Sequence, residues 1–179
     1  MWIKLMLIDE TEHLIIREWE PCEAKEAAEL LSLFDSKAGF DEEKVLSYID
    51  VAYGFYGYGY WGVFEKKSGR MIGLAGFREG SCPLEIGYAV REEYRNRGFA
   101  TEAVKSLTEF ALSDFLWVVT EEDNREKEEE LFCEASSDSA QIKLFGLFYE
   151  EKLLCYGRTK KDNIASQRVL ISNGFKEIR

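Results

Sequence analysis

The residues of this chain best suited to chemistry gather in the stretch YRNRGFATEA, residues 94–103. A strand-like run precedes it, and apolar residues at helical spacing follow from Phe99. The first turn of a helix leaves about four backbone N–H groups without partners, and the helix dipole favours an anion there. Gly98 lets the backbone come close to a ligand, and Arg95 and Arg97 can add charge-assisted bonds to phosphate oxygens. The segment therefore predicts a site for a diphosphate.

Two other phosphate motifs are missing from the sequence. There is no G-x-x-x-x-G-K-[ST], which excludes a P-loop, and no G-x-G-x-x-G, so a dinucleotide-binding fold has no support. The R-x-x-G-x-A pattern taken alone also fits an ordinary junction between a strand and a helix.

Length and charge narrow the class of protein. The 179 residues fit one domain, and the contents of 46% apolar and 14% aromatic residues predict a real core. The net charge of −11 argues against nucleic-acid binding, and it suits either a cationic substrate or simple solubility. No apolar run is long enough for a membrane span, and Asp9 and Glu10 come too early for a signal peptide. We therefore expect a cytoplasmic protein without membrane contact.

Metal binding is not expected. Four scattered cysteines form no C-x-x-C pair, which predicts buried thiols. Because His13 is the single histidine of the sequence, most kinds of zinc site are excluded. Its place beside an apolar run predicts an ordinary residue at a strand edge.

The elements that must position the diphosphate site follow an α+β pattern. Alternating apolar residues predict strands, and apolar residues at helical spacing predict helices. The tract at residues 53–60 alternates tyrosine with glycine, which predicts a strand leading into the hairpin that follows. Predicted strands are 13–19, 61–77 (a hairpin), 81–90, 115–119, 130–135, 141–149 and 152–159; predicted helices are 21–35, 41–54, 99–112 and 162–175.

Three segments together resemble the GNAT superfamily of N-acetyltransferases. Residues 85–107 (EIGYAVREEYRNRGFATEAVKSL) look like its acyl-CoA-binding segment, with the signature [Q/R]-x-x-G-x-[G/A] at 95–100. Residues 163–175 (NIASQRVLISNGF) are similar to the N-x-x-S…N-G-F helix of the branch that acetylates ribosomal-protein N-termini, polyamines and aminoglycosides. Residues 14–30 match the opening strand and helix more loosely. The resemblance implies one domain over residues 1–179, with a mixed, mostly antiparallel twisted sheet between helices in α/β/α-type layers.

The resemblance also implies how the co-substrate acetyl-CoA is held. The backbone of Tyr88, Ala89 and Val90 would pair with the pantetheine arm, and Asn163 would contact the same arm. The amides of the signature turn would hold the pyrophosphate; these belong to Arg95, Asn96, Arg97, Gly98, Phe99, Ala100 and Thr101.

For catalysis, the resemblance implies direct attack of a neutral amine on the thioester, with a backbone N–H near Val90 polarising the carbonyl. Glu85 is the candidate base, and a surface or structural carboxylate is the alternative. Many relatives use a tyrosine on the last helix as the acid, but that position is Leu170 here. Ser166 can donate to the leaving sulfur, or it caps and packs the helix.

The C-terminal half departs from the family. Relatives continue past the last helix with two strands, whereas this chain ends at GFKEIR. Residues 113–152 instead form an insertion with strand-like runs. We therefore predict that residues 141–149 supply the missing strand of the central sheet; the alternative is that a second protomer of a homodimer supplies it.

The sequence thus predicts an acetyl-CoA-dependent N-acetyltransferase acting on a primary amine, which could be a protein N-terminus, a polyamine or another small amine. A non-catalytic acyl-CoA-binding or regulatory module on the same fold is the first alternative, because the acid position holds Leu170. An acidic interaction protein that shares the fold is the second.

Overall fold

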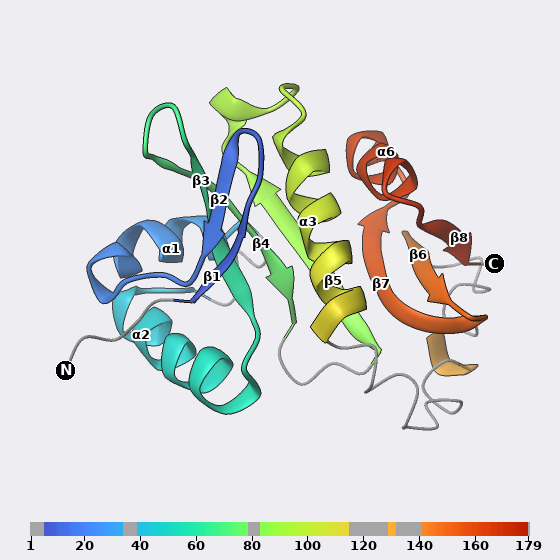
Figure 1. The fold of residues 1–179 in the computed structure, drawn as a ribbon, viewed down its shortest axis with the longest axis horizontal. Helices are drawn as coiled ribbons and strands as arrows, with labels where there is room; N and C mark the ends of the chain where they lie inside the picture. The colour runs from blue at the N-terminus through green and yellow to red at the C-terminus, as the bar shows by residue number, and fades with distance from the viewer. Residues whose placement is uncertain (1–5, 34–38, 79–82, 115–128, 132–140, 179) are drawn as a thin grey trace.

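The computed structural model describes residues 6–33, 39–78, 83–114, 129–131 and 141–178. Within these residues, eight strands form one sheet in the order β1-β2-β3-β4-β5-β7-β6-β8 (Figure 1). Neighbouring strands are antiparallel except β5 and β7, which are parallel. The strands are β1 (Leu7–Glu10), β2 (Leu14–Arg17), β3 (Tyr60–Glu65), β4 (Met71–Phe77), β5 (Leu84–Val90), β6 (Ile142–Tyr149), β7 (Lys152–Lys160) and β8 (Lys176–Ile178).

Helices cover both faces of the sheet. Helices α3 (Phe99–Asp114) and α6 (Ile164–Ser172) share one face, and their apolar residues join a core with the inward side chains of β4, β5 and β7. Helices α1 (Ala24–Leu31) and α2 (Glu42–Val51) cover the other face over β3 and β4 (Figure 1). The predicted α+β fold of mostly antiparallel strands between helices is confirmed.

Local sequence explains where these helices begin. A 3₁₀ turn at Pro21–Glu23 leads into α1, and Glu20 and Glu23 form a reciprocal capping box around it. The carboxylate of Asp41 accepts a hydrogen bond from the Lys44 amide, which makes Asp41 the N-cap of α2.

The predicted strand at residues 53–60 is wrong for all but its last residue. The chain forms a π-helical turn at Ala52–Tyr56 directly after α2, and Gly57 stops it in the left-handed region at φ 75°. The hydroxyl of Tyr48 accepts a hydrogen bond from the Tyr60 amide at 2.7 Å, and the hydroxyl of Tyr53 donates to the Tyr60 carbonyl. Tyr48 and Tyr53 therefore bind the first residue of β3 from the helical segments, and no tyrosine of the tract before Tyr60 belongs to a strand.

Residues 142–149 form a central strand of the sheet, as predicted. Strand β6 pairs with β7 from Ile142↔Lys160 to Tyr149↔Lys152, and its other edge pairs with β8 at Leu144↔Ile178. It therefore lies between β7 and the single short strand that follows α6. Residues 129–131 are helical, so the strand prediction fails there, and the other residues of the predicted runs 115–119 and 130–135 lie outside the described residues.

Candidate active site

Strand β5 has one edge without a partner strand over its second half. It pairs with β4 as far as Val90, but it pairs with β7 only from Leu84↔Cys155 to Ile86↔Gly157. The amide of Arg78 donates to the Glu85 carbonyl, so Glu85 and every second residue after it direct their backbone groups to β4. The N–H and C=O groups of Tyr88 and Val90 therefore face the gap between β5 and β7.

The turn after β5 presents a row of free amides. The Arg95 amide donates to the Glu92 carbonyl at 3.1 Å, and the next backbone donor to a protein acceptor is Glu102, bonded to the Gly98 carbonyl at 3.0 Å. In the described part of the chain, the amides of residues 96–101 donate to no protein group. Gly98 has φ +84°, with open space where a side chain would begin. Such a row at the start of the 16-residue helix α3 is a ready anion site.

A cavity of about 610 Å³ joins this row to the open edge of β5. Every residue predicted to bind the co-substrate lines it except Arg97, and Ser166 lines it too. The predicted residues on its wall are Tyr88, Ala89, Val90, Arg95, Asn96, Gly98, Phe99, Ala100, Thr101 and Asn163.

The two arginines of the turn behave differently. The Nε of Arg95 donates to the Val90 carbonyl at 3.1 Å, which ties the turn to the end of β5 while the side chain stays on the cavity wall. Arg97 turns away: its guanidinium donates to the Glu93 carbonyl at 2.9 Å and lies 5.3 Å from the ring centre of Tyr94. The Arg97 side chain, predicted to bind phosphate, thus lies outside the cavity because the backbone of the preceding 3₁₀ turn binds it.

Helix α6 brings Asn163 and Ser166 to the same cavity. Asn163 is the N-cap of α6, and its Oδ1 accepts a hydrogen bond from the Ser166 amide at 3.1 Å. The hydroxyl of Tyr88 reaches from β5 to within 2.8 Å of the Ser166 Oγ and donates to the Ser166 carbonyl at 3.0 Å. Burial raises the pKa of Tyr88 to about 12, although the bond to Ser166 opposes the rise. The cavity therefore holds two adjoining, protonated hydroxyls.

Glu85 lies apart from this group. Its backbone alternates with that of Tyr88, so its side chain lies on the other face of the sheet. Its Oε1 is 3.4 Å from the Nε of Arg158, and its Oε2 is 3.4 Å from Arg78 and accepts from the Tyr156 hydroxyl at 3.1 Å. The structure therefore places the predicted base in an ion-pair cluster beside the point where β5 and β7 separate, and outside the cavity.

Long-range contacts fix the first turn of α3, which carries the amide row. The Glu102 carboxylate accepts hydrogen bonds from the Thr11 hydroxyl and from the amide of His13, and lies 3.0 Å from the Nδ1 of His13. Burial opposes ionisation of Glu102, but these hydrogen bonds outweigh it and hold its pKa below the usual value. From the other side, Asn173 donates to the Thr101 carbonyl at 3.2 Å. His13, predicted to be an ordinary residue at a strand edge, thus lies in the turn before β2 and is a partner of α3.

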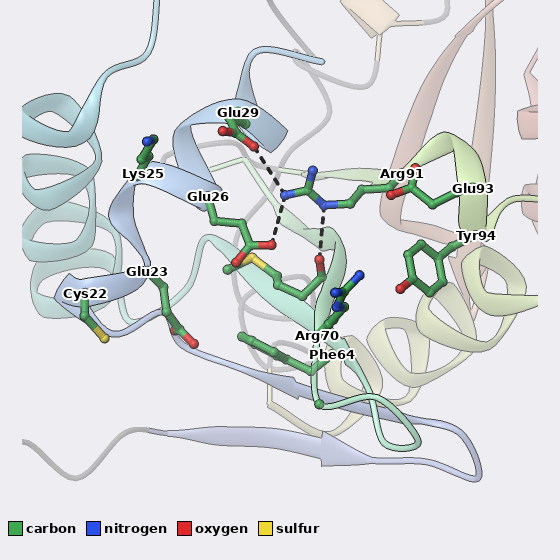
Figure 2. A pocket seen from close by; sticks show the side chains of 12 residues that line it. Cys22, Glu23, Lys25, Glu26, Glu29, Phe64, Arg70, Arg91, Glu93 and Tyr94 are labelled. Atoms are coloured by element: carbon green, nitrogen blue, oxygen red, sulfur yellow. Dashed lines mark hydrogen bonds and ion pairs between the residues drawn. The ribbon is translucent and has the colours of Figure 1, made fainter.

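A second cavity of about 680 Å³ lies beyond the end of β5, beside α1 (Figure 2). Arg91 crosses it: the Nε donates to the Met71 carbonyl at 3.2 Å, and Nη2 lies 3.0 Å from Glu26 and 3.5 Å from Glu29 (Figure 2). Arg91 follows the last residue of β5, and its side chain therefore joins α1 to the first residue of β4.

Metal ligands, membrane-spanning helices and cysteines were the other features that the sequence raised. The described residues contain no cluster of histidine, cysteine or carboxylate side chains that could hold a metal, and no helix among them could cross a membrane. Cys155 is buried and Cys22 is exposed, so the prediction of buried thiols is wrong for Cys22, which lies in the surface turn before α1; Cys82 and Cys133 lie outside the described residues.

Comparison with known proteins identifies the fold. The family described as acetyltransferase (GNAT) domain matches residues 13–176. The chain belongs to the GNAT family of acetyltransferases. Similar solved structures include the ribosomal-protein-S5-alanine acetyltransferase from Vibrio fischeri, with a TM-score of 0.58 and 17% identity over 94% of this chain and 82% of that chain. The GNAT acetyltransferase from Bacillus anthracis has a TM-score of 0.56 and 18% identity over 94% and 82%.

A third similar structure is a ribosomal L7/L12 α-N-protein acetyltransferase, with a TM-score of 0.56 and 15% identity over 94% of this chain and 81% of that chain. At these identities, the likeness of the three structures shows the fold. Membership of the GNAT family implies acetyl-CoA as co-substrate, and the cavity with its amide row and open strand edge fits such a molecule.

Two features of this GNAT domain bear on catalysis. Leu170, which the sequence resemblance places where an acid tyrosine is expected, is 1% exposed and packs against Gly157 of β7, so it provides no donor. Arg168, two residues after Ser166, lines the cavity from the exposed side of α6, and the sequence reasoning missed it. The signal was present: in an α-helix, residues 165, 168 and 169 share one face, and all of them line the cavity.

Proposed function

We propose that the protein transfers an acetyl group from acetyl-CoA to a primary amine in a ternary complex. The observation that carries the proposal is the row of free amides at residues 96–101, which opens into the same cavity as the unpaired edge of β5. A diphosphate is the ligand chemistry that suits such a row, and an extended amide-bearing chain is the chemistry that suits an open strand edge.

The pyrophosphate of acetyl-CoA would accept hydrogen bonds from the amides of Asn96 to Thr101, with the Arg95 side chain nearby. The pantetheine arm would pair with the N–H and C=O groups of Tyr88, which face the gap. The Val90 carbonyl already accepts from Arg95, so the Val90 N–H is left to polarise the thioester carbonyl. The Nδ2 of Asn163 would donate a hydrogen bond to the pantetheine arm, because the Oδ1 caps α6.

The amine would approach from the face of the sheet that carries Glu85. We propose Glu85 as the group that accepts the amine proton, directly or through a water molecule. Its exposed partner Arg78 has a side chain 65% accessible, so a cationic amine can replace Arg78 beside Oε2. Ser166, on the cavity wall, is proposed as the donor to the leaving sulfur. The chemistry is then direct attack: the C–N bond forms, the C–S bond breaks, and the electron pair of that bond moves to sulfur.

The acceptor class remains a protein N-terminus, a polyamine or another small amine. The names of two similar structures favour a protein N-terminus as the first acceptor to test, because those proteins are named as acetyltransferases of ribosomal proteins. The acidic surface, with a net charge of −11, suits a cationic acceptor of any of these kinds.

Thermal unfolding and thiol release test the proposal together. Acetyl-CoA at about 100 times its Kd adds about 2.7 kcal/mol to the free energy of unfolding, which raises the Tm by about 5–10 °C. An enzyme also releases free CoA thiol when a panel of N-terminal peptides, polyamines and small amines is added. Failure of acetyl-CoA to raise the Tm would contradict the proposal.

A non-catalytic acyl-CoA-binding module is the second candidate, because Leu170 provides no donor and Glu85 is bound by two arginines and a tyrosine. Such a module would show the same rise in Tm with acetyl-CoA, but no amine of the panel would release thiol from it.

A further inference from the structure

The hydroxyl of Tyr88 has no role in the pairing of β5 with pantetheine, which uses only its backbone. Yet the side chain crosses from β5 to α6, where its oxygen lies 2.8 Å from the Ser166 Oγ and 3.0 Å from the Ser166 carbonyl. Both residues line the cavity, on the face opposite Glu85. This pair of hydroxyls therefore lies on the wall beside the open strand edge, where a thioester sulfur would have to leave.

The pair has two hydrogen-bonding arrangements, because each hydroxyl has one proton. In the first, the phenol donates to the Ser166 carbonyl and the serine donates to the phenol oxygen, so neither proton is left for a ligand. In the second, the phenol donates to the Ser166 Oγ and the serine proton is free to point into the cavity. A charge-assisted bond to a thiolate is about twice as strong as a neutral one, so a developing negative charge on sulfur favours the second arrangement.

We propose that Tyr88 is a positioning residue that orients the Ser166 hydroxyl as a donor to the sulfur of acetyl-CoA. The two hydroxyls then supply the donor to the leaving sulfur that Leu170 cannot supply. This inference rests on the proposed function. As the C–S bond breaks, its electron pair moves to sulfur and the serine proton forms a hydrogen bond to it. Glu85 takes the proton lost by the amine nitrogen, and the thiolate takes its proton from solvent, so both hydroxyls keep their own protons.

The environment of Tyr88 suits this part. Burial raises its pKa to about 12, so the phenol stays protonated as a donor at neutral pH. The Ser166 amide is held by the Asn163 cap, which fixes the backbone under the hydroxyl. Tyr88 on β5 and the Asn163 cap of α6 thus both hold the Ser166 hydroxyl in place, and each belongs to a rigid element.

Four variants test the proposal in the full-length protein with acetyl-CoA and the most active amine of the panel. Tyr88→Phe and Ser166→Ala each remove one hydroxyl and keep the rest of the side chain. We expect each to lower kcat about 10- to 100-fold, the effect of one charge-assisted hydrogen bond in the transition state, and to leave the Kd for CoA within about twofold. The double variant should be about as slow as the slower single one, since both residues act through the same proton. Ser166→Thr, which keeps a hydroxyl, should recover most of kcat.

Tyr149→Phe makes the same chemical change in a tyrosine at the end of β6, outside the cavity, and should keep the original kcat. Full kcat in Tyr88→Phe would overturn the inference, as would single effects that multiply in the double variant or a loss of CoA affinity that matches the loss of kcat. These results would leave the proposed function intact. If the protein binds CoA but no amine of the panel causes thiol release, the proposed function is overturned, and the inference with it. If Tyr88→Phe does not fold, Ser166→Ala and Ser166→Thr test the same proton from α6.

Discussion

Replacing Gly98 with alanine separates backbone strain from ligand binding. Gly98 has φ +84°, and no protein atom lies within 4 Å of the position its Cβ would take. Alanine there meets no protein group, but it adopts a left-handed conformation that costs about 1–2 kcal/mol. The Tm should therefore fall by about 2–8 °C. The added methyl also enters the cavity beside the amide row, where it would displace the pyrophosphate from one or two amides.

A hydrogen bond to a charged group contributes about 1.5–3 kcal/mol, so Gly98→Ala should weaken CoA binding about 10- to 100-fold. Isothermal titration calorimetry measures this Kd directly. Gly69→Ala is the matched control, because Gly69 lies in the β3–β4 turn at φ +68° with equally open space. It should lose similar stability and keep the original Kd. If the two variants lose the same stability and both keep the original Kd, the amide row is not where CoA binds.

Three further predictions concern the surroundings of the site. The folded pKa of Glu102 is lowered, so its stabilising effect is present above its unfolded pKa of about 4.3 and is lost as the pH falls through the folded value; Glu102→Ala should lower the Tm at pH 7 and flatten its decline in acid. Arg168→Ala should weaken CoA binding about two- to fivefold and make the Kd less sensitive to salt, measured by calorimetry at two ionic strengths; an unchanged Kd at low salt would contradict this. Arg91→Ala leaves the Met71 carbonyl without its donor and should cost about 1–2 kcal/mol in urea unfolding, whereas Arg70→Ala, in the same cavity, should cost less than about 0.5.

The parts of the site that depend on local sequence could be predicted. The strand that ends at Val90, the turn with Gly98 and the helix from Phe99 lie within one continuous segment, where alternation, a glycine and helical spacing determine structure. The predicted central strand at residues 141–149 was also correct, because two apolar runs joined by a short connection tend to pair as a hairpin, as β6 and β7 do.

The parts that depend on distant residues could not be predicted. Nothing in the sequence around Glu85 shows that Arg158, on β7, binds its carboxylate. The link from Tyr88 to Ser166 spans 78 positions and needs the two elements to face each other across the gap. The strand prediction for residues 53–60 failed for a related reason. The alternation of tyrosine and glycine is typical of a strand, but hydroxyl contacts from Tyr48 and Tyr53 to Tyr60 favour the helical turn.

The central claim is that the amides of residues 96–101 bind the pyrophosphate of CoA. Titration of the ¹⁵N-labelled protein followed by amide NMR tests it most directly, with CoA compared against pantetheine, which has no phosphate. We predict that CoA shifts the signals of residues 96–101 together with those of Tyr88 and Val90, whereas pantetheine shifts only the last two. Unchanged signals at residues 96–101 in the presence of saturating CoA would contradict the account.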